Sequence, residues 1–249
     1  MRTSNPALSS KTFGGFVGSR PSGATMTISG ATNKTGVLLA LAIITAVIPW
    51  RIFFKTENPA LLMPYLIGGG VGGFVMALVT IFKKEWSPVT APAYALAEGL
   101  LLGAVSALFE LRYPGLVLQA VGLTFGTLGA LLVAYKTGVI KATENFKLGV
   151  VAATGAIGLF YLVGFVLRFF GINMPLIHSS GTFGILFSLG VVVVAALNLV
   201  LDFDFIEEGA QRGAPKYMEW YAAFGLMVTL VWLYLEVLRL LSKLQDRRR

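Results

Sequence analysis

The sequence predicts an all-α integral membrane protein with seven transmembrane helices. Hydrophobic residues make up 56% of the 249 residues, charged residues make up 13%, and the mean hydropathy is +0.77. A soluble domain has about 45–50% apolar and about 25% charged residues. Seven stretches are long enough to cross the hydrocarbon layer, which takes about 20 apolar residues. They are continuous, whereas a membrane barrel has alternating segments of about ten residues, so we expect helices.

The expected spans, in chain order, cover about residues 37–54, 60–82, 91–111, 115–136, 147–170, 181–203 and 217–241. Proline and glycine mark the separators, as in Tyr113-Pro114-Gly115 and Gly213-Ala214-Pro215. We expect residues 37–245 to form one membrane domain. Residues 1–36 are rich in Ser, Thr, Gly and Asn, so we expect a disordered or surface-lying tail and not a signal peptide.

Lysine and arginine residues in short loops indicate which side of the membrane each loop faces. With the N-terminus in the cytoplasm, eleven of them lie on the cytoplasmic side and four on the other side before the C-terminal tail. We therefore expect a cytoplasmic N-terminus. Seven spans then place the basic C-terminal tail outside, and a final segment that enters the membrane and turns back is the alternative.

The composition argues against several functions. The chain has no cysteine and one histidine, His178, so thiolate and multi-histidine metal sites are excluded. It has no nucleophile elbow, no His-Glu-x-x-His and no phosphate-binding loop, so we do not expect an enzyme. The net charge of +8 comes from residues that flank apolar spans, which fits lipid headgroups better than nucleic acid.

Glycines occur at close spacing in the second, third and fourth spans. They include Gly68–Gly73, the pair Gly99 and Gly103, and the series Gly122, Gly126 and Gly129. Small residues four apart let membrane helices approach closely, so we expect tight packing at the pair and the series. For the cluster in the second span, a hinged helix beside a pore is an equal alternative, because so many glycines weaken a helix.

Acidic residues concentrate at the end of the sixth span, in Leu201-Asp202-Phe203-Asp204-Phe205-Ile206-Glu207-Glu208. Ionisable groups at such a place are costly to desolvate and indicate a functional site. Asp202 and Asp204 lie about 160° apart if the helix continues, at 100° per residue. One of them should point inward and the other to the interface, and we expect Asp202 to be the inward one.

Other acids lie inside the third and seventh spans. Glu98 has apolar neighbours on both sides, so its carboxyl should be protonated, paired or facing water. Glu219 begins the seventh span, with Lys216 or Arg212 in reach, and could form a titrating pair with Asp202. Near the end of the same span, Glu236 and Arg239 are spaced for an ion pair, which we read as interfacial.

These features together resemble the Bax inhibitor family. The similar segments are Ala97–Leu100 in the third span, Leu118–Phe125 in the fourth, the aspartate that ends the sixth, and Leu233–Leu241 in the seventh. The resemblance covers about residues 37–245, and the tail segment Asn5-Pro6-Ala7-Leu8 is similar to a bacterial branch of the family. It implies six helices around a central seventh. It also implies a pH-sensitive calcium leak, controlled by an aspartate pair from helices six and seven and latched by an arginine of helix two.

The family's site residues carry over in part. Asp202 matches the aspartate of helix six and is the one candidate to contact calcium. Lys83 and Lys84 occupy the latch region, where lysine is a point charge and lacks the fork of arginine. The aspartate of helix seven falls at Thr229, which is not an acid. Either another carboxylate takes its place, with Asp204, Glu219 and Glu98 as the candidates, or the protein lacks this switch.

The sequence thus favours a pH-sensitive cation (calcium) leak channel in a bacterial plasma (inner) membrane, with no cofactor apart from a possible calcium ion. The expected partners are the lipid bilayer and calcium or protons. The alternative is a regulator without transport, which acts by lateral contacts with other membrane proteins such as a quality-control protease. A proton-coupled transporter is a third, less favoured hypothesis.

Overall fold

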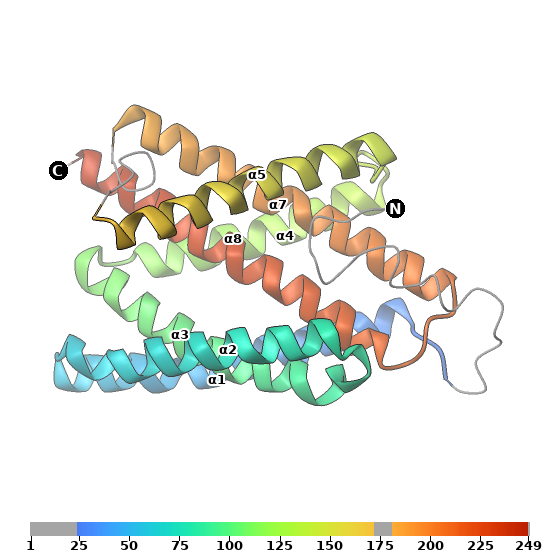
Figure 1. Ribbon diagram of the computed structural model, residues 1–249, viewed down its shortest axis with the longest axis horizontal. Helices are drawn as coiled ribbons and strands as arrows, with labels where there is room; N and C mark the ends of the chain where they lie inside the picture. The colour runs from blue at the N-terminus through green and yellow to red at the C-terminus, as the bar shows by residue number, and fades with distance from the viewer. Residues whose placement is uncertain (1–23, 172–180, 249) are drawn as a thin grey trace. The chain divides into compact units, whose positions relative to one another are not determined.

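A computed structural model describes residues 24–171 and 181–248, and every described element is helical (Figure 1). The elements are α1 (Ile28–Thr56), η2 (Pro59–Leu62), α2 (Met63–Phe82), η3 (Lys84–Trp86), α3 (Ser87–Arg112), α4 (Leu116–Lys136), α5 (Glu144–Phe169), α7 (Thr182–Gln211) and α8 (Met218–Arg248). Within this part of the chain, seven helices are long and apolar enough to cross a membrane. The predictions of an all-α fold and of seven spans are confirmed. His178 and residues 1–23 lie outside the described residues.

Two predicted boundaries need correction. α1 begins at Ile28, so the first span starts before residue 37 and the expected tail of residues 1–36 ends earlier. Thr27 caps this helix, because its hydroxyl accepts a hydrogen bond from the backbone amide of Gly30 at 3.0 Å. At the other end of the chain, α7 does not stop at residue 203 but continues through the acidic stretch to Gln211.

The chain divides into two compact units, and two helices contribute to both. Within the described residues, unit 1 contains 115–171, 181–203 and 229–248, and unit 2 contains 24–114 and 204–228. The boundary therefore falls within α7 directly after Phe203, and within α8 directly before Thr229. The expected arrangement of six helices around a seventh stays a prediction.

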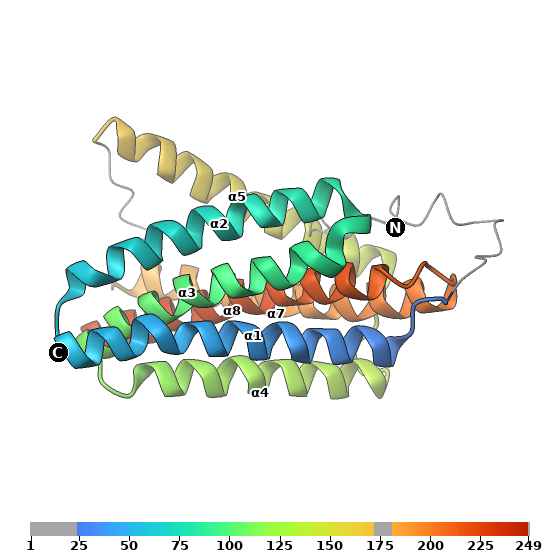
Figure 2. The same ribbon diagram turned by 90° about the horizontal axis from the view of Figure 1, so that it is seen from below.

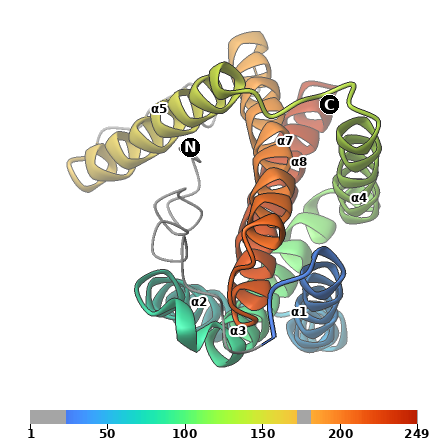
Figure 3. The ribbon, with the colours of Figure 1, turned by 90° about the vertical axis from the view of Figure 1, so that its right-hand side faces the viewer.

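In unit 2, α3 packs against both α1 and α2, and the three helices run alongside one another (Figures 2 and 3). Glycines make these approaches possible. A Cβ atom at Gly99 or Gly103 would overlap the backbone of α1, and one at Gly69 would lie 2.8 Å from the carbonyl oxygen of Ala97 on α3. The packing predicted for Gly99 and Gly103 is confirmed. The glycine cluster of α2 also serves packing and does not interrupt the helix.

In unit 1, α5 packs on α7 through a ring contact between Phe160 and Phe187, with centroids 5.1 Å apart. Polar contacts add to this, since the Asn198 amide donates to the Thr154 hydroxyl at 2.9 Å. The expected packing role of the α4 glycines is wrong within the described chain. Cβ atoms at these three positions would meet no atom within 4 Å, so this face of α4 is open; they are Gly122, Gly126 and Gly129.

Candidate functional site

Asp202 lies inside the helical structure, on α7. Its side chain is 1% exposed, whereas Asp204 is half-buried, so the prediction that Asp202 is the inward aspartate is confirmed. The carboxylate oxygen Oδ2 of Asp202 has no hydrogen-bond partner among the described residues. A buried carboxyl that lacks a donor on one oxygen is costly as an anion, because nothing replaces the lost water.

The residue that meets Asp202 from α8 is Thr229. The Thr229 hydroxyl hydrogen-bonds the Asp202 carboxyl, and the Thr229 side chain is itself buried. Counting along the seventh span had placed the family's second aspartate at this position. The structure therefore brings the two positions together, with a hydroxyl in place of the second carboxyl. A hydroxyl can donate to Asp202, but it cannot carry the second negative charge.

Glu98 is a second buried carboxyl and lies at the contact between α2 and α3. Its side chain is 7% exposed. The nearest part of α2 is Gly73, where an added Cβ would lie 2.7 Å from Glu98 Oε2. Among the residues that the structure describes, none donates a hydrogen bond to this carboxylate. The sequence identified Glu98 as an acid inside the third span, and the structure shows that its carboxyl lies against Gly73.

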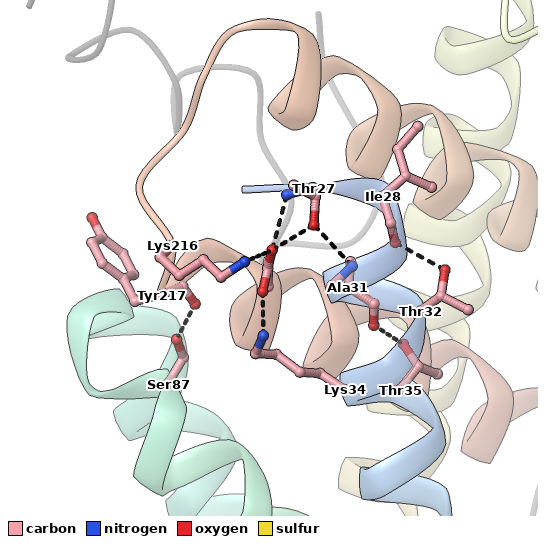
Figure 4. Close-up of polar contacts among 11 residues, drawn as sticks. Thr27, Ile28, Ala31, Thr32, Lys34, Thr35, Ser87, Lys216 and Tyr217 are labelled. Carbon is pink, nitrogen blue, oxygen red and sulfur yellow. Dashed lines mark hydrogen bonds and ion pairs between the residues drawn. The ribbon is translucent and has the colours of Figure 1, made fainter. Parts of the chain in front are cut away.

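Glu219 is fully buried but well partnered, and it ties the start of α1 to the start of α8. Figure 4 shows the surrounding residues, among them Thr27, Lys34 and Lys216. Its carboxylate accepts hydrogen bonds from the backbone amide and the hydroxyl of Thr27, each at 2.9 Å, and from the Lys216 ammonium at 2.7 Å. Lys34 of α1 forms an ion pair with the other oxygen. The predicted contact with Lys216 is confirmed. We call this cluster of Thr27, Lys34, Lys216 and Glu219 the clasp.

Two backbone contacts strengthen the clasp. The Met26 amide donates to the Ala214 carbonyl at 2.7 Å, and the Ser87 hydroxyl donates to the Tyr217 carbonyl at 2.9 Å. Tyr217 precedes α8, and burial, assisted by the Glu85 carboxylate, raises the pKa of its hydroxyl. Tyr217 therefore stays neutral near pH 7 and adds no charge to the clasp.

The two glutamates of the stretch also lie on α7 and have partners on the same helix. Arg212 forms an ion pair with Glu208, and the Gln211 side chain donates to Glu207 at 3.2 Å. Of the two basic residues expected near Glu219, Arg212 pairs with Glu208 and Lys216 pairs with Glu219.

The latch candidates differ in their surroundings. Lys83 is exposed at the end of α2, and the Lys84 ammonium lies 5.7 Å from the ring centroid of Tyr221 on α8. Neither lysine forms an ion pair with a residue in the described ranges. A lysine over an aromatic face gains a cation–π attraction, which holds its side chain near α8.

The far end of α8 carries a polar cluster that sequence reasoning found in part. Arg239 pairs with Glu236 at 2.8 Å, as predicted, and also donates to the Tyr161 hydroxyl of α5 at 2.7 Å. Lys243 was missed: its buried ammonium donates to Ser188 Oγ at 2.8 Å and to the Gly184 carbonyl at 3.0 Å, both on α7. Its partners lie 55 and 59 residues away, so no local pattern indicates them.

No group of three or more histidine, cysteine, aspartate or glutamate residues comes together in the described part of the chain. Calcium takes six to eight oxygen ligands in proteins. Asp202 and Thr229 supply only carboxyl and hydroxyl oxygens of two side chains, so they do not fit a resident calcium ion.

The fold and these residues define a class: an integral membrane protein of seven helices that buries carboxyl side chains inside its helix packing. The chain matches the family model described as Bax inhibitor 1 like over residues 5–246, and it therefore belongs to this family. Comparisons with curated proteins and with solved structures gave no match.

Proposed function

We propose that this protein is a cation leak whose permeability to calcium is set by protonation of Asp202. The observation that carries the proposal is the buried Asp202 carboxyl, held by Thr229 on one side and without a partner at Oδ2. Desolvation disfavours the charged form of such a group, so a change in pH can switch its charge.

The switch acts through the fit of α7 against α8 within unit 1. With a proton, Asp202 is neutral, accepts from Thr229 and packs as a small polar group. Without the proton, the Asp202 carboxylate carries a negative charge in a contact that excludes water. Entry of water or a cation lowers the free-energy cost of that charge. Loss of the proton thus favours a wetter contact that a cation can cross. Calcium is the cargo in this scheme, and carboxyl oxygen suits it as a hard ligand.

The test is calcium flux into liposomes that contain the purified protein and an enclosed calcium dye. We expect flux from the wild type that rises as pH rises. Asp202→Asn, which cannot ionise, should hold flux at the low-pH level throughout. Glu57→Gln removes an exposed acid between α1 and η2 and should leave the profile unchanged. Absence of flux at every pH, or an unchanged profile in Asp202→Asn, contradicts the proposal.

A second candidate function is regulation by lateral contact with another membrane protein. The open face of α4 favours it, since Gly122 and Gly126 are spaced four apart and meet no other atom. Gly126→Leu would fill this face. If binding of a partner, measured by cross-linking in membranes, is lost in this variant while calcium flux persists, the contact function is separate from transport.

We further propose a bacterial plasma membrane location with a cytoplasmic N-terminus, supported by the distribution of basic residues. Single cysteines test the orientation, because the chain has none of its own. A cysteine at exposed Lys83 should react with an impermeant reagent only after the membrane is opened. A cysteine at exposed Glu57 should react in intact cells.

A further inference from the structure

The Glu98 carboxyl occupies space that is free because Gly73 of α2 has no side chain. α2 and α3 run side by side (Figure 2). The Glu98 carboxyl lies against Gly73 of α2. A Cβ at Gly73 would lie 2.7 Å from Oε2, closer than atoms normally approach. At neighbouring Gly72, a Cβ would meet only the Ala97 Cβ at an ordinary 3.5 Å. A side chain at Gly73, and not one at Gly72, would therefore occupy the space that the Glu98 carboxyl fills.

No counter-charge faces Glu98 from the helices packed around it. α2 carries no charged residue at all over its 20 residues. α1 meets α3 at this level through Ala42 and Thr45, and the charged residue in the first half of α8, Glu219, is held in the clasp. Among the described residues, Tyr94, one turn earlier on α3, interacts electrostatically with Glu98.

A row of polar groups connects this level with the start of α3. Thr90, Tyr94 and Glu98 are spaced four apart, which places them on one face of the helix. The Thr80 hydroxyl of α2 donates to the Thr90 hydroxyl at 2.8 Å, and both threonines are buried. Tyr94 is also buried, and its ring packs edge-on against Phe224. The hydroxyls of Thr90 and Tyr94 thus lie between Glu98 and the N-terminal end of α3, which directly follows Trp86.

From this arrangement we infer that Glu98 is a proton-binding site within unit 2. A buried carboxylate without donor or counter-charge costs several kcal/mol, at least about 2.5 in a membrane helix, and a bound proton removes that cost. The Glu98 carboxyl can bind a proton but is not a calcium site, because one carboxyl cannot supply the six to eight oxygen ligands that calcium takes. The inference does not rest on the proposed leak or on Asp202.

The test is labelling of the full chain in liposomes with a membrane-soluble carbodiimide, read by mass spectrometry of peptides. The reagent adds the O–H of a neutral carboxylic acid across its N=C bond, and the adduct rearranges to a stable N-acylurea without a leaving group. We expect Glu98 to be labelled, with the labelled fraction falling about tenfold between about pH 6 and about pH 9 as the carboxyl ionises. Asp202→Asn should not change this profile.

Gly73→Ala and Gly72→Ala form a matched pair. Only the first places a Cβ against the carboxyl, so only the first should shift the pH at which labelling of Glu98 is half lost. Labelling that does not change with pH, or an equal shift in both variants, overturns the inference.

A second measurement covers the case in which the reagent does not reach Glu98. Ionisation at high pH leaves an uncompensated charge in the fold, so the Tm of the wild type in detergent should fall as pH rises. Glu98→Gln keeps the shape and cannot ionise, and its Tm should fall less over the same range. Parallel Tm profiles for the two proteins, together with unlabelled Glu98, contradict a proton site.

Discussion

The carboxyl of Asp202 on α7 accepts a hydrogen bond from the hydroxyl of Thr229 on α8, and both side chains are buried. Each residue lies directly at the place where its helix passes from one unit to the other: Asp202 is one residue before the boundary in α7, and Thr229 is the first residue after it in α8. The contact between Asp202 and Thr229 thus lies within unit 1, beside the points where α7 leaves this unit and α8 enters it.

Thr229→Asp would restore the acid pair that the family resemblance implies. Two carboxyls in contact cannot both ionise readily, so the pair would share a proton. We expect the pH midpoint of calcium flux to rise by about one unit or more relative to the wild type. Thr229→Asn has the same size without the charge and should leave the midpoint near that of the wild type. Equal midpoints for the two variants would show that this position does not influence the proton on Asp202.

Gly30→Ala should weaken the clasp. The new Cβ would overlap the Glu219 carboxylate, which Lys34 and Thr27 hold in place. Such overpacking typically costs about 1–3 kcal/mol, so the Tm in detergent should fall. Gly36→Ala lies on the same helix and meets no atom within 4 Å. Alanine gains roughly 0.5–1 kcal/mol over glycine in a helix, so this control should be neutral or stabilised. A Tm loss of the same size in both variants would contradict the role given to Gly30.

The helical period and the spacing of residues predicted the local features of the site. Asp202 was expected to be the inward one of two aspartates that lie about 160° apart on a continuing helix, and its side chain is buried. Thr229 was identified through the family resemblance, by counting back from Arg239 to the position of the family's second aspartate. The ion pair between Glu236 and Arg239 followed from a spacing of three residues. Features set by one helix were thus accessible from the sequence, whereas the position that faces Asp202 came from the family resemblance.

Contacts between distant segments were not accessible in this way. Lys34 binds Glu219 across 185 residues, and it lies in a polar stretch that composition alone assigned to a disordered or surface-lying tail. The cap formed by Thr27 and the partners of Glu219 turn that stretch into helix, so tertiary contacts override the local composition. The open α4 glycines show the reverse case, since their spacing is that of a packed pair and only the surroundings reveal that no helix of the described chain covers them.

Gly103→Ala should destabilise the contact between α1 and α3. The added Cβ would overlap the Ala46 carbonyl, and a backbone atom cannot move aside as a flexible side chain can. We expect a loss of about 1–3 kcal/mol, read as a lower Tm. Gly126→Ala on α4 has open space around the new atom and should be neutral or stabilised by roughly 0.5–1 kcal/mol. If both substitutions lower the Tm equally, the α4 face is covered in the purified protein, for instance by a second copy.

Ser188→Ala should destabilise the far end of α8. Ser188 accepts one of the two hydrogen bonds that the buried Lys243 ammonium donates, and its loss leaves a desolvated N–H of a charged group without an acceptor. An unsatisfied buried donor costs about 1–3 kcal/mol, so the Tm should fall by several degrees. Ser242→Ala is the control, because the Ser242 hydroxyl donates to the Arg239 carbonyl of its own helix and its removal frees no buried partner from another helix. Equal Tm values for the two variants would mean that Lys243 finds another acceptor or reaches water, and that α7 and α8 are not joined at this point.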